Sequence, residues 1–509
     1  MMKKISRRDF LKASGVAAAA AALTACGSAS STAASSAAAS TASSAAASST
    51  GEITHLVMTF FSWTGAPTDT QKVQDAMNEI LRDKIGVEVE LQIYDTGSYK
   101  QSLTLALSGG EQVDLMNCIF LGYASMAAQG YLLDLEQDDL LKTYGSGIID
   151  AVGEDYIDAC RINGTLYGLP NNRDMAVGRG CTAIGTEYLT AVGYTAAADA
   201  TDIIQSTQDE VDDLLAKIHA KFPDLETYRP ASTNNLAQYS SLDLLGGNVF
   251  GVLTNYGKEL TVVDPFTSQD YTDYCNVMYK WNQAGYISKD AATDTTSVGT
   301  LMSYTTGGKP GIKNQESTGD GRDMTILQTK DTFLASSGVA SFPWTIPITT
   351  VNAQKAMELY NEFYTNADLE NLLIYGIEGT HYKVVDGQAQ TIADASGNSA
   401  YYTLGWEAPN QFLGYTLVGD SKDLWDNIKK FNDESTKSAA VGFTFDATNV
   451  STELAAVQAV YDEYQKSVEY GFVDPATALP EMDKKMMDAG LQTIIDEKQK
   501  QLDAWAKTK

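Results

Sequence analysis

Histidine is scarce in this sequence. The chain has only three histidines, His55, His219 and His381, and neither His55 nor His219 has a carboxylate or cysteine at the spacing of a metal site. The motifs of a phosphate-binding loop, a serine nucleophile elbow and a zinc protease are absent too. We therefore expect neither an enzyme nor a cofactor or metal. A glycosidase needs only two carboxylates, and 65 acidic residues supply many pairs, so that class stays an alternative.

Cysteine is rare as well, with five in 509 residues. Cys26 belongs to the amino-terminal segment. The other four are far apart and form no C-x-x-C motif, so the sequence implies no disulfide framework. Cys118 lies in an apolar run, which favours a buried position.

Basic residues are outnumbered by acidic ones, 36 against 65, and the formal net charge is −29. Residues 1–25 hold five basic side chains and one acidic, so the chain without them is four charges more negative. This excess disfavours nucleic acid or an anionic lipid surface as a partner of the folded body. Beyond the amino-terminal segment, no apolar run approaches the ~20 residues of a membrane span.

The first 26 residues have the order of an export signal. A basic stretch to Lys12 is followed by an Ala-rich stretch and then by Leu23-Thr24-Ala25-Cys26. This ending matches the bacterial lipobox, which predicts removal of residues 1–25 and acylation of Cys26 with a diacylglycerol. Residues 6–12 match the twin-arginine signature, with the general export route as the alternative. We expect a protein anchored by lipid to the outer face of the cytoplasmic membrane.

Residues 27–50 contain only Gly, Ser, Ala and Thr. Such a segment has nothing to bury, so residues 26–51 are interpreted as the lipidated cysteine and a disordered tether.

The folded body begins with an α/β alternation. Apolar periodicity predicts strands over 53–61, 87–93 and 113–120, with helices over 73–81 and 99–107 between them. Strands separated by helices pair in parallel in an open sheet, where ligands bind at the carboxyl ends of the strands. A cluster of Gly, Pro and Asn at 167–174 indicates a break, and the stretch from 452 to 509 reads as almost entirely helical.

Four segments carry a resemblance to a known family. They are Val89–Gly110 with Asp114-Leu-Met, Leu169-Pro-Asn-Asn-Arg-Asp174, Tyr375-Gly-Ile-Glu-Gly-Thr-His-Tyr382, and Gly471-Phe-Val-Asp-Pro475 continuing to Trp505. With the lipobox and the acidic body, they resemble the extracellular solute-binding lipoproteins of ABC importers, in the maltose-binding-protein-like branch. The last two segments are similar to a subgroup with a carboxy-terminal domain of unknown function.

The resemblance implies two α/β lobes joined by a hinge, with the ligand in the cleft between them. We interpret the break at 167–174 as this hinge. By analogy the amino-terminal lobe takes residues 52–172 and 302–385, and the carboxy-terminal lobe takes 173–301 and 386–509. The implied function is capture of a solute, most often an oligosaccharide, for an ABC permease. We expect a monomer.

Sugar rings stack on aromatic side chains, and their hydroxyls pair with polar ones. Loop positions that the analogy places at the cleft predict a ligand site of Trp63, Tyr123, Asn172, Arg173, Trp344 and Glu378. Trp406 follows a glycine in another loop, whereas Trp281 lies in a helical pattern and is expected in the core.

Two alternatives stay open. Arg173 in the cleft would suit the carboxylate of a peptide or amino-acid-like solute. A surface adhesin or sensor accessory would bind a protein instead, and no sequence motif decides against it.

Overall fold

The computed structural model describes residues 52–509 except 197–201, 231–235, 237–239, 247, 295–300 and 396. The predicted signal peptide, Cys26 and the tether lie outside the described residues. In the described part of the chain, no helix combines the length and the apolar character needed to cross a membrane. Gly51–Lys509 forms one compact unit with two large sheets and two large apolar cores.

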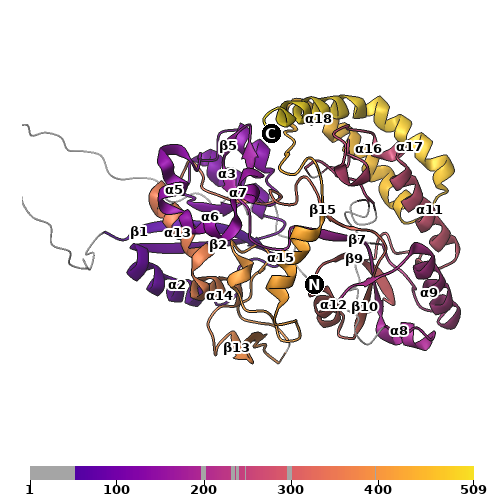
Figure 1. Ribbon diagram of the computed structural model, residues 1–509, viewed down its shortest axis with the longest axis horizontal. Helices are drawn as coiled ribbons and strands as arrows, with labels where there is room; N and C mark the ends of the chain where they lie inside the picture. Colours follow the sequence, from indigo (N-terminus) through magenta and orange to yellow (C-terminus); the bar gives the residue numbers. More distant parts are fainter. Residues whose placement is uncertain are drawn as a thin grey trace, which may run out of the picture. The chain divides into compact units, whose positions relative to one another are not determined.

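The first sheet contains the three strands that open the folded body (Figure 1). In sheet order its strands are β2 (Val87–Asp95), β1 (Thr54–Ser62), β3 (Leu115–Asn117), β12 (Trp344–Thr345) and β6 (Gly168–Leu169). β1 is parallel to β2 and β3, whereas β12 is antiparallel to β3 and β6. The connecting helices are α2 (Thr70–Ile85) and α3 (Tyr99–Gly109). The predicted α/β fold class is confirmed.

Local sequence explains these elements. Val73, Met77 and Leu81 occupy one buried face of α2, which ends at Gly86 in the left-handed conformation (φ 66°). Alternate residues of β2 are buried from Val87 onward. β3 is shorter than predicted because the next amide, that of Cys118, donates to the carbonyl of Pro343 in an irregular segment.

The rest of the first core is mainly helical. The elements between β3 and β6 are α4 (Tyr123–Ala128), η1 (Gln137–Asp139), α5 (Leu140–Tyr144), α6 (Ser146–Val152), α7 (Glu154–Asp158), β4 (Arg161–Ile162) and β5 (Thr165–Leu166). Those that return later are α13 (Ala353–Thr365), α14 (Ala367–Tyr375), β13 (Tyr382–Val385), β14 (Gln388–Thr391), η5 (Gln411–Leu413) and α15 (Leu424–Glu434).

The second sheet is organised around β7 (Val177–Gly185), which pairs antiparallel with three other strands. These partners are β9 (Ser303–Gly308), β10 (Met324–Gln328) and β11 (Thr332–Leu334). The remaining strands are β8 (Ile204–Gln205) beside β10 and β15 (Thr436–Lys437) beside β11.

Helices cover this second sheet, and α16, α17 and α18 pack against one another (Figure 1). The elements are α8 (Thr186–Ala191), α9 (Gln208–Lys221), η2 (Asn255–Gly257), η3 (Pro265–Thr267), α11 (Gln269–Gln283), α12 (Ile312–Asp320), η6 (Thr448–Val450), α16 (Ser451–Glu469), α17 (Pro475–Ala489) and α18 (Leu491–Ala506). Trp281 of α11 is fully buried.

The sheets divide the chain differently from the boundaries drawn by analogy. Residues 303–334, assigned above to the amino-terminal lobe, contain three strands of the second sheet. Conversely, Ala389, Tyr401 and Ala408, assigned to the other lobe, pack in the first core. The physical reason is that β9–β11 bond to β7 along their length, a long-range pairing that no local pattern specifies.

Candidate functional site

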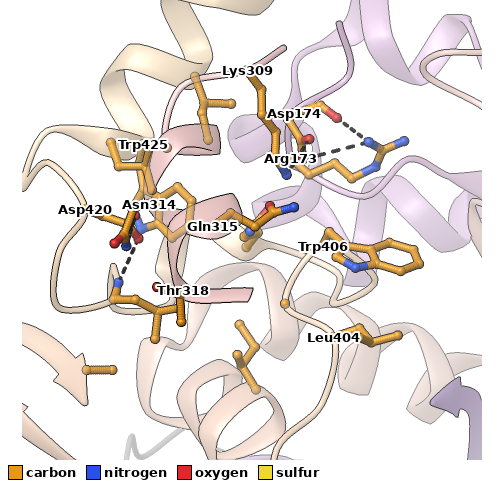
Figure 2. Close-up of a pocket in the computed structure, with 18 of the residues that line it drawn as sticks. Arg173, Asp174, Lys309, Asn314, Gln315, Thr318, Leu404, Trp406, Asp420 and Trp425 are labelled. Carbon is orange, nitrogen blue, oxygen red and sulfur yellow. Dashed lines mark hydrogen bonds and ion pairs between the residues drawn. The ribbon is translucent and has the colours of Figure 1, made fainter. Parts of the chain in front are cut away.

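A cavity of about 810 Å³ lies beside the crossing from the first core into the second sheet. Its lining comes from segments far apart in the sequence (Figure 2). The polar and charged lining includes Arg173, Asp174, Lys309, Asn314, Gln315, Thr318, Gln390, Thr391, Gln411 and Asp420. The aromatic lining is Phe342, Tyr375, Tyr402, Trp406 and Trp425.

Three rings form what we call the aromatic wall, namely Phe342, Trp406 and Trp63. Trp406 meets Phe342 edge to face with centroids 5.4 Å apart, and its centroid is 6.4 Å from that of Trp63. Trp63 extends the wall beyond the cavity and is 60% exposed. The guanidinium of Arg173 lies 4.3 Å from the Phe342 centroid. The wall thus offers apolar surface with a cation at one end.

The two cations of the cavity converge on Asp174 (Figure 2). Lys309 Nζ lies 3.0 Å from Asp174 Oδ2, and Arg173 Nη1 lies 3.9 Å from Oδ1. Arg173 also donates to the Asp174 carbonyl and, at 3.0 Å, to Ser341 Oγ. Burial lowers the pKa of Arg173. Because Asp174 faces both cations, neither is free to hold a ligand anion without competition.

The other side of the cavity is built from α12 and from the loop before α15. Asn314 Nδ2 donates to Asp420 Oδ1 at 2.7 Å, and Leu417 N donates to Oδ2 at 3.2 Å. Burial raises the pKa of Asp420. Trp425 Nε1 donates to the Gly414 carbonyl at 2.7 Å, which fixes that ring. In Figure 2, Trp425, Asn314 and Asp420 lie on one side and Trp406 and Leu404 on the other.

A second hollow of about 500 Å³ shares Thr391 and Tyr402 with the cavity. It is lined by Thr64 and residues 66–68, after β1, and by 397–399. The two hollows together give room for a ligand of several linked units, with hydrogen-bonding groups on one side and rings on the other.

Comparisons with known proteins show what the chain resembles. Residues 439–507 match the domain of unknown function DUF3502, and residues 4–24 match the twin-arginine translocation pathway signal sequence. A carbohydrate ABC transporter substrate-binding protein of Streptococcus pneumoniae is 25% identical over 452 residues, which is 87% of this chain and 89% of that protein. This chain is a relative of ABC-transporter substrate-binding proteins.

Solved structures show the same two-lobe fold. The N-glycan transport solute binding protein NgtS from Streptococcus pneumoniae matches with a TM-score of 0.77 and 23% identity, over 89% of this chain and 99% of that one. NgtS in complex with Man5GlcNAc matches with a TM-score of 0.68 and 23% identity, over 90% and 99%. The expected subgroup of solute-binding proteins and the export signal are thereby confirmed, and the protein is extracytoplasmic.

Two of the six predicted site residues lie at or next to the cavity. Arg173 lines it, and Trp63 contacts Trp406. Asn172 does not line the cavity: its amide donates to the Pro409 carbonyl at 2.8 Å, and its side chain donates to the Ala151 carbonyl at 3.2 Å.

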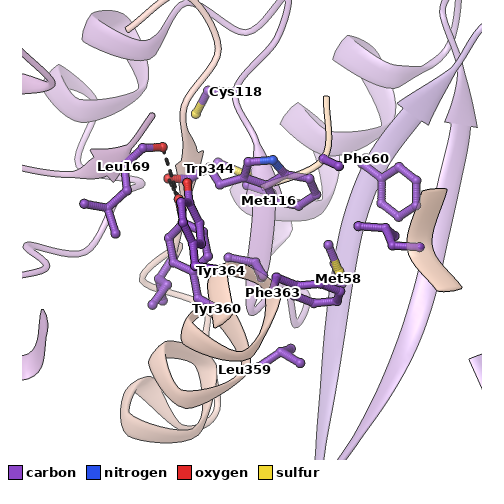
Figure 3. Close-up of a cluster of buried hydrophobic side chains, with 14 of the residues drawn as sticks. Met58, Phe60, Met116, Cys118, Leu169, Trp344, Leu359, Tyr360, Phe363 and Tyr364 are labelled. Carbon is purple, nitrogen blue, oxygen red and sulfur yellow. Dashed lines mark hydrogen bonds between the residues drawn. The ribbon is translucent and has the colours of Figure 1, made fainter. Parts of the chain in front are cut away.

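The structure places Trp344 and Tyr123 in the core, which corrects the prediction that they contact ligand. Trp344 is 1% exposed, packs against Phe60 and donates from Nε1 to the Glu407 carbonyl (Figure 3). Tyr123 is 3% exposed and donates to the Cys160 carbonyl at 2.7 Å. Both rings are large apolar groups whose single polar atom finds a backbone partner, which is how such residues are buried.

Glu378 is exposed in the turn before β13, where its backbone forms an isolated β-bridge with Tyr382. It does not line the cavity. The nearby His381 is buried, with Nε2 3.2 Å from Asp69 Oδ2. In the described part of the chain, no group of three or more His, Cys, Asp or Glu is placed to hold a metal. The carboxylate of Asp294, one of two aspartates near residue 290, accepts a hydrogen bond from the Arg229 guanidinium at 2.8 Å, so its partner is a side chain of the protein.

Sequence reasoning missed Lys309, Asn314, Asp420 and Trp425. Lys309 stands in the Gly-rich stretch 307–311, a loop signal that could have been used. The other three lie in or next to helices that carry no motif, and only the long-range packing brings them to the cavity.

Proposed function

We propose that this protein is the substrate-binding component of an ABC importer and that it captures an oligosaccharide in the cavity between Trp406 and Asp420. The observation that carries the proposal is the pairing of an aromatic wall with a rim of amide and carboxylate side chains. Sugar rings present apolar faces to such a wall, while their hydroxyls need donors and acceptors of this kind. The carbohydrate transport relative supports the same substrate class.

The state of Arg173 favours a sugar over a peptide. A peptide carboxylate needs a cation with free donors. Here Arg173 donates to Ser341 and to the Asp174 carbonyl, and Lys309 is paired with Asp174. An acidic ligand would have to displace these contacts, whereas a neutral saccharide would not.

Anchoring and delivery complete the proposal. Acylation of Cys26 would hold the body at the outer face of the cytoplasmic membrane, with residues 27–50 as tether. The loaded protein would then dock on an ABC permease. The carbohydrate ABC transporter relative and the twin-arginine match support this location.

A thermal-shift screen of saccharides against peptides tests the proposal, because a ligand that binds only the folded state raises the melting temperature. Saccharides, and not peptides, should stabilise the protein, and calorimetry should then give the affinity. The same mixtures, analysed by chromatography, should contain the saccharide uncut, whereas cleavage products would indicate a glycosidase. Stabilisation by peptides alone would overturn the substrate class.

A further inference from the structure

The loop of residues 404–411 carries several side chains that face the cavity. Leu404, Trp406 and Gln411 all line it. Residues 404–410, all of which the structure describes, form no helix or strand. The position of Trp406 therefore depends on what holds this loop from outside.

Glu407 makes three of the hydrogen bonds between the loop and its surroundings. Its Oε1 accepts from the amide of Phe61 at 3.2 Å, near the end of β1 and two residues before Trp63. Its carbonyl accepts from Trp344 Nε1 at 2.7 Å and from Asn171 Nδ2 at 2.5 Å. Glu407 thus ties the loop to β1, to β12 and to the residue at the start of the hinge.

The carboxyl group of Glu407 is deeply buried, and the residue is only 2% exposed. Its Oε2 has no hydrogen-bond partner among the residues that the structure describes. Burial raises its pKa well above the ordinary value for glutamate, which favours the neutral form. A buried carboxyl with one oxygen left unbonded lowers the free energy of unfolding, so a role for it in the site would explain its presence.

We propose that Glu407 is the positioning residue of the aromatic wall: it fixes Trp406 relative to Trp63 and couples both rings to the hinge at Asn171. The proposal rests on the proposed function, in which a saccharide stacks on that wall. Glu407 itself is buried and does not line the cavity, so it acts through the rings and not by touching ligand.

Two of the three rings of the wall, Trp63 and Trp406, come from separate segments, so a shared contact is needed to fix their spacing. Trp63 follows β1, whereas Trp406 lies more than three hundred residues later, and their centroids are 6.4 Å apart. Phe61, the amide partner of Glu407, also contacts both rings, with centroids 5.3 Å from Trp63 and 5.9 Å from Trp406. A hydrogen bond from Phe61 to Glu407 therefore sets the spacing of the wall at its base.

Affinity measurements on matched variants test the proposal. Glu407→Met keeps the volume and removes the acceptor, and we expect it to weaken saccharide binding about tenfold. Glu407→Gln keeps the shape of the side chain and the accepting oxygen. Its binding should therefore stay within about threefold of the wild type. Glu469→Met is the control, because Glu469 is a fully buried glutamate of the second core. It should lower the melting temperature and leave affinity unchanged.

A double-mutant cycle separates positioning from general stability. With Trp406 already replaced by alanine, Glu407→Met should cost less than about twofold further affinity, because the ring that it positions is gone. Equal losses in both backgrounds, or an affinity loss in Glu469→Met as large as in Glu407→Met, would overturn the proposal.

A measurement without ligand decides the proposal even if no saccharide binds. The six tryptophans can be labelled with 5-fluorotryptophan and assigned by single replacements. Glu407→Met should shift or broaden the fluorine resonances of Trp63 and Trp406 and leave that of Trp281 unchanged. Unchanged Trp63 and Trp406 resonances would overturn the positioning role, whereas failure of all saccharides to bind would overturn only the proposed function. If Glu407→Met does not fold, Asn171→Ala, which removes the hydrogen bonds from the Asn171 side chain to the Glu407 and Ala408 carbonyls, replaces it in this measurement.

Discussion

Asn314 in α12 and Asp420 in the loop before α15 are joined by a 2.7 Å hydrogen bond that closes one side of the cavity. α12 packs on β10 of the second sheet, whereas the loop of Asp420 bonds to β14, which packs in the first core. The bond therefore links elements of the two cores directly at the proposed ligand site.

Asn314→Ala should weaken saccharide binding by about tenfold, since it leaves a partly buried carboxylate oxygen without its donor. Calorimetry with the best saccharide measures this. Asn449→Ala is a matched control, because Asn449 also donates to a carboxylate, that of Glu497, at a surface away from the cavity. Equal affinity losses in the two variants would contradict a specific role for Asn314.

Trp406→Ala should lower affinity about 30-fold, which corresponds to a loss of about 2 kcal/mol for a stacking residue at the centre of a binding site. Trp63→Ala should act in the same direction with a smaller effect, because that ring is 60% exposed. Trp505→Ala, in α18, should bind as the wild type does. Wild-type affinity in Trp406→Ala would remove the aromatic wall from the site.

Trp344→Ala, in contrast, should lower stability and not act through the ligand site. The ring is 1% exposed in the first core, so its loss should lower the free energy of unfolding by about 3–5 kcal/mol. Urea denaturation checks this. Unchanged stability together with lost binding would show that Trp344 contacts the ligand after all.

Stability should fall as the pH rises from about 4.5 to about 8 because of Glu370 in α14. This side chain is fully buried, and burial raises its pKa from 4.5 to about 8. The folded pKa lies above the unfolded one, so the contribution of Glu370 is complete below pH 4.5 and is lost as the pH rises through about 8. Urea midpoints at pH 5, 6.5 and 8 should therefore decline in the wild type. In Glu370→Gln, which keeps the acceptor for the Asn410 amide, the decline should be shallower. Parallel declines would exclude Glu370 as the cause.

Export and anchoring give a further prediction. Cys26→Ser removes the thiol that would take the lipid, so the protein should appear in the soluble extracytoplasmic fraction instead of the membrane fraction. Fractionation and the mass of the mature chain measure this. A membrane-bound Cys26→Ser protein with the mass of the unaltered mature chain would contradict acylation at this residue.

The sequence by itself determined the export signal and the α/β character of the body. These features depend on local order, such as the alternation in β2 or the apolar face of α2, and each is complete within some twenty residues. Arg173 and Trp63 could be proposed for the same reason, since a hinge-like loop and a strand end are local features.

Only the tertiary structure decided the rest of the site. Neither Trp344, in the two-residue strand β12, nor Trp406, in an irregular loop, lies in a long element, yet one is enclosed by β3, β6 and α13 and the other faces the cavity. Nothing near either residue in the sequence distinguishes them, because burial is decided by partners such as Phe60 and Phe342 that arrive from distant segments. The pairing of Asn314 with Asp420, 106 residues apart, arises in the same way from long-range packing.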